Sequence, residues 1–148
     1  MRKTAGFSLL ELLLTIAIVL GLAGAAAGFY TQFLVRNAVS NASDQLVQSL
    51  RKAQFYALES YRSNTGGWGV YWDNGSHTLS LYQGVDYAHK TFTEDFIISP
   101  SVSLAGITEI SFSRVNGVPS AGAPATITVS GLGSSRTISL NGQGVVSP

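Results

Sequence analysis

The sequence predicts an α+β fold: one long N-terminal α-helix, transmembrane in its first half, with a small antiparallel β-sheet packed on its exported half. Three features of the 148 residues predict this fold. The chain opens with an apolar run, the run continues as an amphipathic helical pattern, and alternating apolar and polar residues between turn residues fill the rest. We expect a leader over 1–6, a membrane-spanning helix over 7–29 and an exported globular domain over 30–148.

The apolar run extends over 22 residues, from Phe7 to Gly28, and Glu11 is its one charged residue. At about 1.5 Å of rise per residue, a helix of this length crosses the hydrocarbon core of a bilayer. Arg2 and Lys3 precede the run, so the positive-inside rule keeps the N-terminus in the cytoplasm and exports the residues after the span. We therefore expect a protein that crosses the cytoplasmic membrane once, with lipid around its membrane-spanning helix.

A helical stripe of apolar residues follows the run, at spacings of three and four. No proline occurs before Pro100, so we expect one continuous helix that ends at about Tyr61 or Arg62, before the SNTGG segment. Such a helix is about 80 Å long. The stripe consists of Val35, Val39, Ala42, Leu46, Leu50, Ala53 and Ala57.

A β-hairpin is predicted next, because the dipeptide Asn74-Gly75 lies between two alternating runs. A two-residue turn there brings the bulky residues of both strands to one face. The cross-strand pairs expected from it are Trp72 with His77, Val70 with Leu79, and Trp68 with Leu81.

Three further alternating runs predict more strands, and residues 83–106 read as a loop-rich connection because they show little periodicity. We expect the apolar face of the resulting sheet to lie on the exported part of the helix. The apolar residues of the three runs are Ile110 and Phe112, Ile127 and Val129, and Ile138 and Leu140.

The composition excludes several classes of function. Nine Lys and Arg face eight Asp and Glu, a balance that argues against nucleic acid as a partner. The chain has no cysteine and no acidic residue after Glu109, so we expect no metal site and no other cofactor. His77 and His89 stand apart from any catalytic Ser or Asp, and His77 reads as a cross-strand packing residue. We expect no catalytic residues and no enzyme.

The N-terminal segment KTAGFSLLELLLTIAIVLG resembles the leader of type IV prepilins and type II secretion pseudopilins. The shared features are a short basic leader, Gly6, then Phe7, and a glutamate, Glu11, at the fifth residue of the apolar helix. The segments LVQSLRKAQFYALES and TISLNGQGVV resemble the end of the long helix and the final strand of minor pseudopilins of the GspH/FimT group. The chain is thereby identified as a candidate member of this superfamily.

The resemblance implies a structural subunit, a minor pilin or pseudopilin. A prepilin peptidase would cleave between Gly6 and Phe7, and the new amine of Phe7 would be N-methylated. The implied partners are other pilin or pseudopilin subunits, the peptidase, and the inner-membrane assembly platform with its ATPase. The implied location is the bacterial inner membrane and then a periplasmic or cell-surface filament.

Glu11 has a physical reason to be in the span if this resemblance holds. Cleavage creates an ammonium group on Phe7, four residues away, so the two charges can lie one turn apart in the same helix. The carboxylate of Glu11 can instead bind the amine of a neighbouring subunit, and only this second use sets the register of a filament.

A second class of function stays open: a secreted binding domain released by an ordinary signal peptidase. The AGAAAG segment around Ala25 to Ala27 fits such a cleavage site. The domain would then bind carbohydrate through Trp68, Tyr71 and Trp72, provided that these aromatic side chains are exposed.

Overall fold

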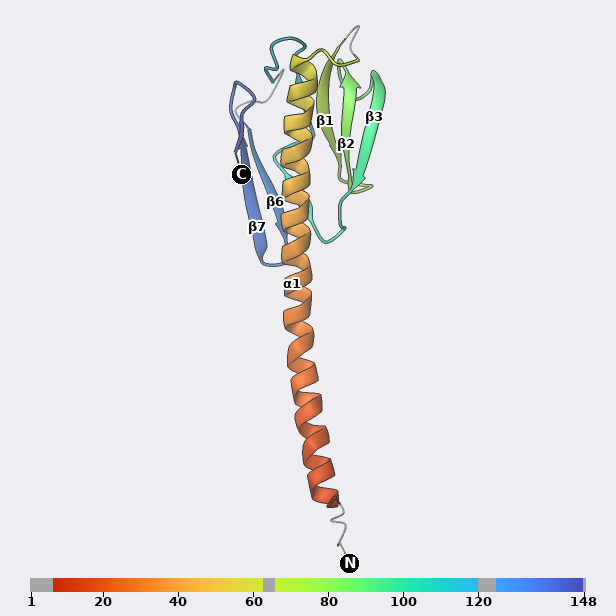
Figure 1. The fold of residues 1–148 in the computed structure, drawn as a ribbon, viewed down its shortest axis with the longest axis vertical. Helices are drawn as coiled ribbons and strands as arrows, with labels where there is room; N and C mark the ends of the chain where they lie inside the picture. Colours follow the sequence, from red (N-terminus) through yellow and green to blue (C-terminus); the bar gives the residue numbers. More distant parts are fainter. Residues whose placement is uncertain (1–6, 63–65, 120–124, 148) are drawn as a thin grey trace, which may run out of the picture. The chain divides into compact units, whose positions relative to one another are not determined.

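The computed structural model describes residues 7–62, 66–119 and 125–147, without the side chains of Ala26 and Ala27. The chain divides into two compact units, Met1–Leu34 and Val35–Pro148, which we describe one at a time. Helix α1, Leu9–Leu58, supplies the described helical part of the first unit and begins the second (Figure 1). Eight strands follow it within the described residues, which confirms the predicted α+β layout.

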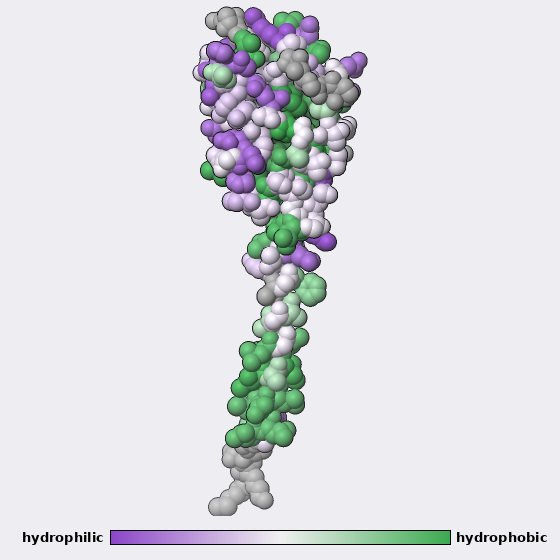
Figure 2. Space-filling model, turned by 180° about the vertical axis from the view of Figure 1, so that it is seen from behind, coloured by the Kyte–Doolittle hydropathy of each residue, from purple (hydrophilic) through white to green (hydrophobic). Residues whose placement is uncertain are grey.

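The first unit consists of the N-terminal stretch of α1. Every side chain described between Phe7 and Leu34 is exposed, and the visible face of this stretch is apolar for most of its length (Figure 2). Among the described helices, α1 is long and apolar enough to cross a membrane. Gly21, Gly24 and Gly28 have open space where a side chain would lie.

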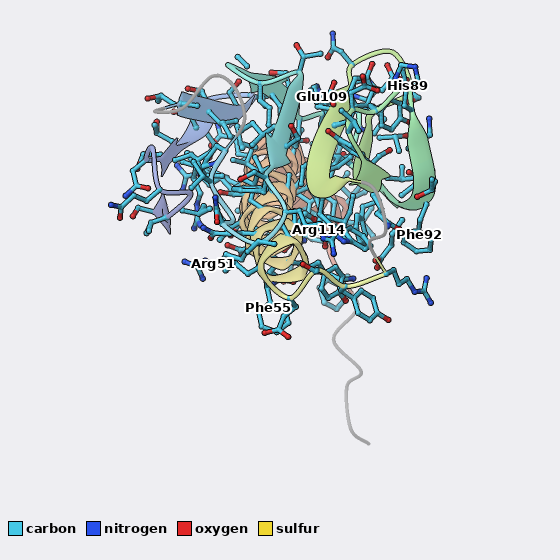
Figure 3. The ribbon with its side chains drawn as sticks, turned by 90° about the horizontal axis from the view of Figure 1, so that it is seen from above. Arg51, Phe55, His89, Phe92, Glu109 and Arg114 are labelled. Carbon is cyan, nitrogen blue, oxygen red and sulfur yellow. The ribbon has the colours of Figure 1, made fainter. Side chains whose placement is uncertain are left out.

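The second unit contains two antiparallel sheets rather than the single sheet that we expected. Their strand orders are β3-β2-β1-β5 and β4-β6-β7-β8, and they lie on different sides of α1 (Figures 1 and 3). The first sheet has β1 (Gly67–Asp73), β2 (Thr78–Gly84), β3 (Lys90–Ile97) and β5 (Glu109–Phe112). The second has β4 (Ser103–Ala105), β6 (Ala125–Gly131), β7 (Ser134–Leu140) and β8 (Val146–Ser147).

The core of the second unit lies where α1 meets the inner faces of the two sheets. The predicted helical stripe is buried along its whole length, and so are the apolar residues predicted for the later strands. Burying one such side chain stabilises the fold by roughly 1.5–3 kcal/mol. The largest side chains of this core include Trp68, Phe112, Leu46, Leu50, Leu79, Leu81, Ile127 and Ile138.

Residues 83–106 form strands β3 and β4, so the expectation of a loop-rich connection is wrong. In β3, Phe92 and Phe96 pack against the core, but Glu94 occupies the position between them on the same face. The Nζ of Lys52, on α1, lies 2.6 Å from a carboxylate oxygen of Glu94. An ion pair thus fills an inward position of the strand, and it hides the alternation of apolar residues.

The β1–β2 hairpin has a four-residue loop over 74–77, so the predicted two-residue turn is wrong. Trp72 pairs with Leu79 and Val70 pairs with Leu81, which shifts each predicted partner by two residues. A shift of two leaves every side chain on the same face, so the bulky residues share the core side as predicted. The carboxylate of Asp73 stabilises the longer loop by accepting hydrogen bonds from the Gly75 N–H and the Ser76 hydroxyl, at 2.9 and 2.8 Å.

Helix α1 ends at Leu58, before the predicted end at Tyr61 or Arg62. Ser60 has a φ of 50°, in the left-handed region. The N–H of Tyr61 donates to the carbonyl of Tyr56 at 3.0 Å, as in a Schellman motif. Glycine usually occupies the left-handed position of this motif, and a serine there gives little sequence signal.

Candidate functional site

The candidate site is the first turn of α1. Ser8 precedes the first helical residue, and its hydroxyl accepts a hydrogen bond from the Glu11 N–H at 3.2 Å. Its carbonyl accepts from the Glu11 and Leu12 N–H groups, at 3.1 and 3.2 Å. Ser8 is therefore the N-cap of α1 and Glu11 is residue N3, the spacing of a capping box. Phe7 and Leu12 occupy the two positions of a hydrophobic staple.

Sequence reasoning missed this role of Ser8, although the S-x-x-E signal was present in the motif. The structure places Glu11 in the first turn of α1 rather than deep inside it. A carboxylate there interacts favourably with the positive end of the helix dipole, by about 0.3–1 kcal/mol. Helix capping is therefore a second physical reason for an acid at this position, beside pairing with an amine.

Phe7 lies just before α1 and is exposed. The expectation that Phe7 and Glu11 lie one turn apart in the same helix concerns the chain after cleavage and stays a prediction; in the chain that still carries residues 1–6, α1 begins at Leu9. Gly6, Arg2 and Lys3 lie outside the described residues. Between Phe7 and Leu34, the described part of the first unit, Glu11 is the only charged residue.

The aromatic residues of the β1–β2 hairpin do not form an exposed platform. Trp68 and Trp72 are only 1% and 3% exposed, and the indole N–H of Trp68 donates to the carbonyl of Tyr61 at 2.9 Å. Tyr71 is partly exposed but stacks on Tyr87, with ring centroids 3.9 Å apart. Neither indole is therefore available to stack on a sugar ring.

Tyr82 lies on the outer face of the same sheet and is nevertheless fully buried. Its hydroxyl donates to the carboxylate of Glu109, which also accepts from the Tyr87 N–H at 2.8 Å. Burial, and then the hydrogen bond to Glu109, raise the pKa of Tyr82 well above its usual range. This arrangement holds the 85–89 loop against the sheet and resembles a structural network rather than a reactive site.

The two histidines lie apart from each other. His89 binds the carboxylate of Asp86 at 2.8 Å; the hydrogen bond from its backbone N–H, and then its imidazole, hold the pKa of Asp86 below the usual range. His77 lies in the hairpin loop rather than in a strand, and its ring meets that of Trp72 edge-on at 6.1 Å. Within the described part of the chain, no three His, Asp or Glu side chains gather as metal ligands would.

No protein-family model matches the chain, and neither a curated protein nor a solved structure does. A functional conclusion therefore depends on the chemistry of the N-terminal segment and on the fold. These two provide an exposed apolar stretch of α1, an acid in its first turn, and a packed α+β unit that follows it.

Proposed function

We propose that this protein is a minor pilin or pseudopilin, a structural subunit of a type IV pilus or of a type II secretion pseudopilus. A prepilin peptidase cleaves it after Gly6, Phe7 is N-methylated, and the first stretch of α1 packs with other subunits in the filament. The observation that carries the proposal is a single α1 that is exposed and apolar up to Leu34 and becomes the core helix of a folded unit from Val35 on.

The exposed stretch supports the proposal because its apolar side chains are exposed in the isolated chain. Leucine, isoleucine and valine dominate it, and several lie more than half exposed, among them Leu9, Leu13, Val19 and Leu22. Soluble proteins rarely expose an apolar surface of this extent. In the proposed cycle, lipid covers it before assembly, and the helices of neighbouring subunits cover it afterwards.

Glu11 supports the same proposal through its charge. A carboxylate inside a membrane-spanning helix costs up to about 3 kcal/mol on insertion scales. A capping box alone is also satisfied by glutamine, which carries no charge. The ammonium group of a neighbouring Phe7 would offset the cost of burying the charge of Glu11. A glutamine has no charge and could not form this ion pair.

The alternative is a secreted binding domain, but two of its three candidate sugar-binding residues, Trp68 and Trp72, are buried in the core. It also requires cleavage near Ala25, within a segment that is helical in the structure. The two functions therefore differ in where the mature chain begins.

Mass spectrometry of the N-terminal peptide, taken from the envelope fraction of the native host, tests the proposal. We expect a chain that begins at Phe7 and carries one N-methyl group. A chain that begins between Ala25 and Gly28 would establish an ordinary signal peptide and overturn the proposal. Replacing Gly6 by leucine is the matched control, because it should abolish processing at Phe7 and leave the AGAAAG segment intact.

A further inference from the structure

The dipeptide Asn-Gly occurs three times in the second unit, at Asn74, Asn116 and Asn141, and all three asparagines are exposed. This dipeptide carries a reaction of its own, because the backbone nitrogen that follows an asparagine can attack the Cγ of the asparagine side chain. A following glycine has no Cβ to hinder the attack. The three copies share the same reacting groups, so the fold decides which of them reacts.

At Asn74 the attacking nitrogen is held by a carboxylate. The Gly75 N–H donates a hydrogen bond to an oxygen of Asp73 at 2.9 Å. The attack requires that this nitrogen lose its proton, and the nitrogen would then carry negative charge beside the negative carboxylate. Two like charges at hydrogen-bond distance repel each other. The fold therefore slows the reaction at Asn74.

At Asn116 the attacking nitrogen is held by a backbone carbonyl. The Gly117 N–H donates to the Ser113 carbonyl at 2.9 Å, and Gly117 is buried. Leu58 lies against this glycine, since a Cβ there would be 2.7 Å from the Cγ of Leu58. The nitrogen has to give up its hydrogen bond inside a packed loop before it can attack. The fold therefore slows this reaction as well.

At Asn141 the attacking nitrogen is free. The Gly142 N–H has no hydrogen-bond partner among the described residues. Gly142 is exposed, and a Cβ there would meet nothing within 4 Å. Hydroxide from the solvent can therefore reach this N–H and remove its proton.

The side chain of Asn141 is already turned back onto its own backbone. Its Oδ1 accepts hydrogen bonds from the N–H groups of Gln143 and Val145, both at 2.9 Å. The first of these bonds closes an Asx-turn, and the ring of that turn contains both reacting atoms, the Cγ of Asn141 and the nitrogen of Gly142. Attack places negative charge on Oδ1, where the two N–H groups stabilise it as the donors of an oxyanion hole do. The Oδ1 atoms of the other two asparagines accept no hydrogen bond from the described residues.

We propose that Asn141 is a site of spontaneous modification, at which asparagine converts to aspartate and isoaspartate. The Gly142 nitrogen loses its proton to hydroxide and forms a bond to Cγ. The Cγ–Nδ2 bond then breaks, and Nδ2 takes a proton from water and leaves as ammonia. Water opens the resulting succinimide ring, giving aspartate when the bond from nitrogen to Cγ breaks and isoaspartate when the bond from nitrogen to the backbone carbonyl carbon breaks. Because the ammonia is lost, the converted share rises with the age of the chain.

The two products act differently on the last turn of the chain. Aspartate keeps a side-chain oxygen for the same two N–H groups and adds one negative charge. Isoaspartate directs the main chain through the side chain and lengthens it by one carbon. The 141–145 turn returns the chain from β7 to β8, and the cross-strand pairs beside it depend on its length. These pairs are Leu140 with Val146 and Ser139 with Ser147. Isoaspartate therefore releases β8.

Peptide mass spectrometry of the purified full-length chain in detergent micelles tests the proposal. The protein is kept at mildly alkaline pH in water enriched in heavy oxygen, so each opened succinimide takes up one labelled atom. Fragmentation that distinguishes aspartate from isoaspartate is applied to samples taken over time. We expect Asn141 to convert several-fold faster than Asn74 and Asn116 in the same folded sample. Denaturant in the same buffer should speed the reaction at Asn74 and Asn116 but not at Asn141.

Gly142→Ala is the matched variant, because its Cβ fits without a clash and hinders the attack. It should slow conversion at Asn141 several-fold and leave the other two asparagines at their parent rates. The proposal is overturned if Asn141 converts no faster than the other two in the folded chain, if denaturant speeds all three alike, or if Gly142→Ala converts at the parent rate.

Hydrogen exchange tests the effect on β8. The peptide that contains isoaspartate separates chromatographically from the unconverted peptide, so exchange of each form can be measured in one aged sample. We expect faster exchange over 139–147 in the isoaspartate form. Equal exchange in the two forms would show that β8 stays paired and would overturn its release.

Discussion

The two stretches of α1 have the same secondary structure and opposite relations to the rest of the chain. From Leu9 to Leu34, every described side chain is exposed, and most are apolar. From Val35 to Leu58, a stripe of apolar residues recurs every three or four positions and is buried, while most exposed positions are polar, apart from Phe55 and Leu58. The first stretch lacks a polar face, and the second has one.

This difference shows where each stretch finds the contacts that keep it folded. The second stretch is amphipathic, and the sheets of its own unit cover its apolar stripe. The first is apolar over most of its surface, and under the proposed function lipid and then other subunits cover it. Three comparisons of variants sharpen this contrast, and a fourth set of variants tests it most directly.

Truncating a leucine should destabilise the second unit only when that leucine belongs to the second stretch. Leu50 is fully buried, so Leu50→Ala leaves a cavity and should lower the free energy of unfolding by about 2–5 kcal/mol. Leu13→Ala, in the exposed stretch, should leave it unchanged. Trp68 and Trp72 are both buried in the second unit, so their fluorescence during denaturant unfolding in detergent micelles reports this unit alone. Equal effects of the two variants would remove the distinction between the stretches.

Adding a methyl group to a glycine should have opposite effects in the two units. A Cβ at Gly28 meets nothing within 4 Å, so Gly28→Ala should stabilise the local helix by about 1 kcal/mol. At Gly67 the nearest atom is the Phe112 carbonyl oxygen, too close for any Cβ, so Gly67→Ala should destabilise the second unit by about 1–3 kcal/mol. Amide hydrogen exchange in micelles measures both. Slower exchange near Gly67 after its substitution would contradict the packing described here.

The second unit should also lose stability in alkali through Tyr82, an effect that the first unit cannot share. The pKa of Tyr82 is raised in the folded chain, so the unfolded chain releases this proton first, from about pH 10 upward. Above that pH the free energy of unfolding should fall by up to about 1.4 kcal/mol per pH unit on account of this group. Tyr82→Phe removes that contribution. The same alkaline slope in both proteins would show that Tyr82 titrates normally.

The sequence predicted the features that follow from hydrophobic period alone. The apolar run, the buried stripe of α1 and the cores of β5, β6 and β7 all show a clear period of 3.6 or 2. Strand β3 was not predicted because Glu94 interrupts the apolar residues of its inner face. The charge of Glu94 is paired with Lys52, which lies 42 residues earlier in the chain. A pairing of that range has no local signal.

The hairpin loop and the ends of α1 were predicted incorrectly or overlooked for a different reason. Asp73 and His77 lengthen the hairpin loop, although Asn74-Gly75 alone predicts a two-residue turn. The left-handed position that ends α1 is a serine, Ser60, where glycine is usual. At the candidate site, Gly6, Phe7 and Glu11 were predicted from the motif and remain predictions about function. Ser8 was readable from the capping-box spacing but was overlooked.

The most direct test asks whether Glu11 serves a neighbouring subunit or only its own helix. Glu11→Leu removes the charge and the cap together and should improve membrane insertion by up to about 3 kcal/mol. It should nevertheless abolish assembly, because the amine of a neighbouring Phe7 is then buried without a partner, at a cost of about 3–5 kcal/mol. Glu11→Gln keeps the capping box without the charge and should assemble at an intermediate level. Ser8→Ala removes the cap hydroxyl, keeps the charge and costs about 0.5–2 kcal/mol of local helix stability.

The measurement is the ratio of sheared filament protein to membrane-bound protein for each variant, with processing at Phe7 checked in the same samples. We predict that Glu11→Leu is processed and inserted but absent from the sheared fraction, whereas Ser8→Ala assembles nearly as well as the parent chain. If Glu11→Leu assembles like the parent, or if Ser8→Ala fails as completely as Glu11→Leu while Glu11→Gln assembles normally, then the carboxylate acts as a helix cap and the first stretch of α1 does not depend on a charge from its neighbour.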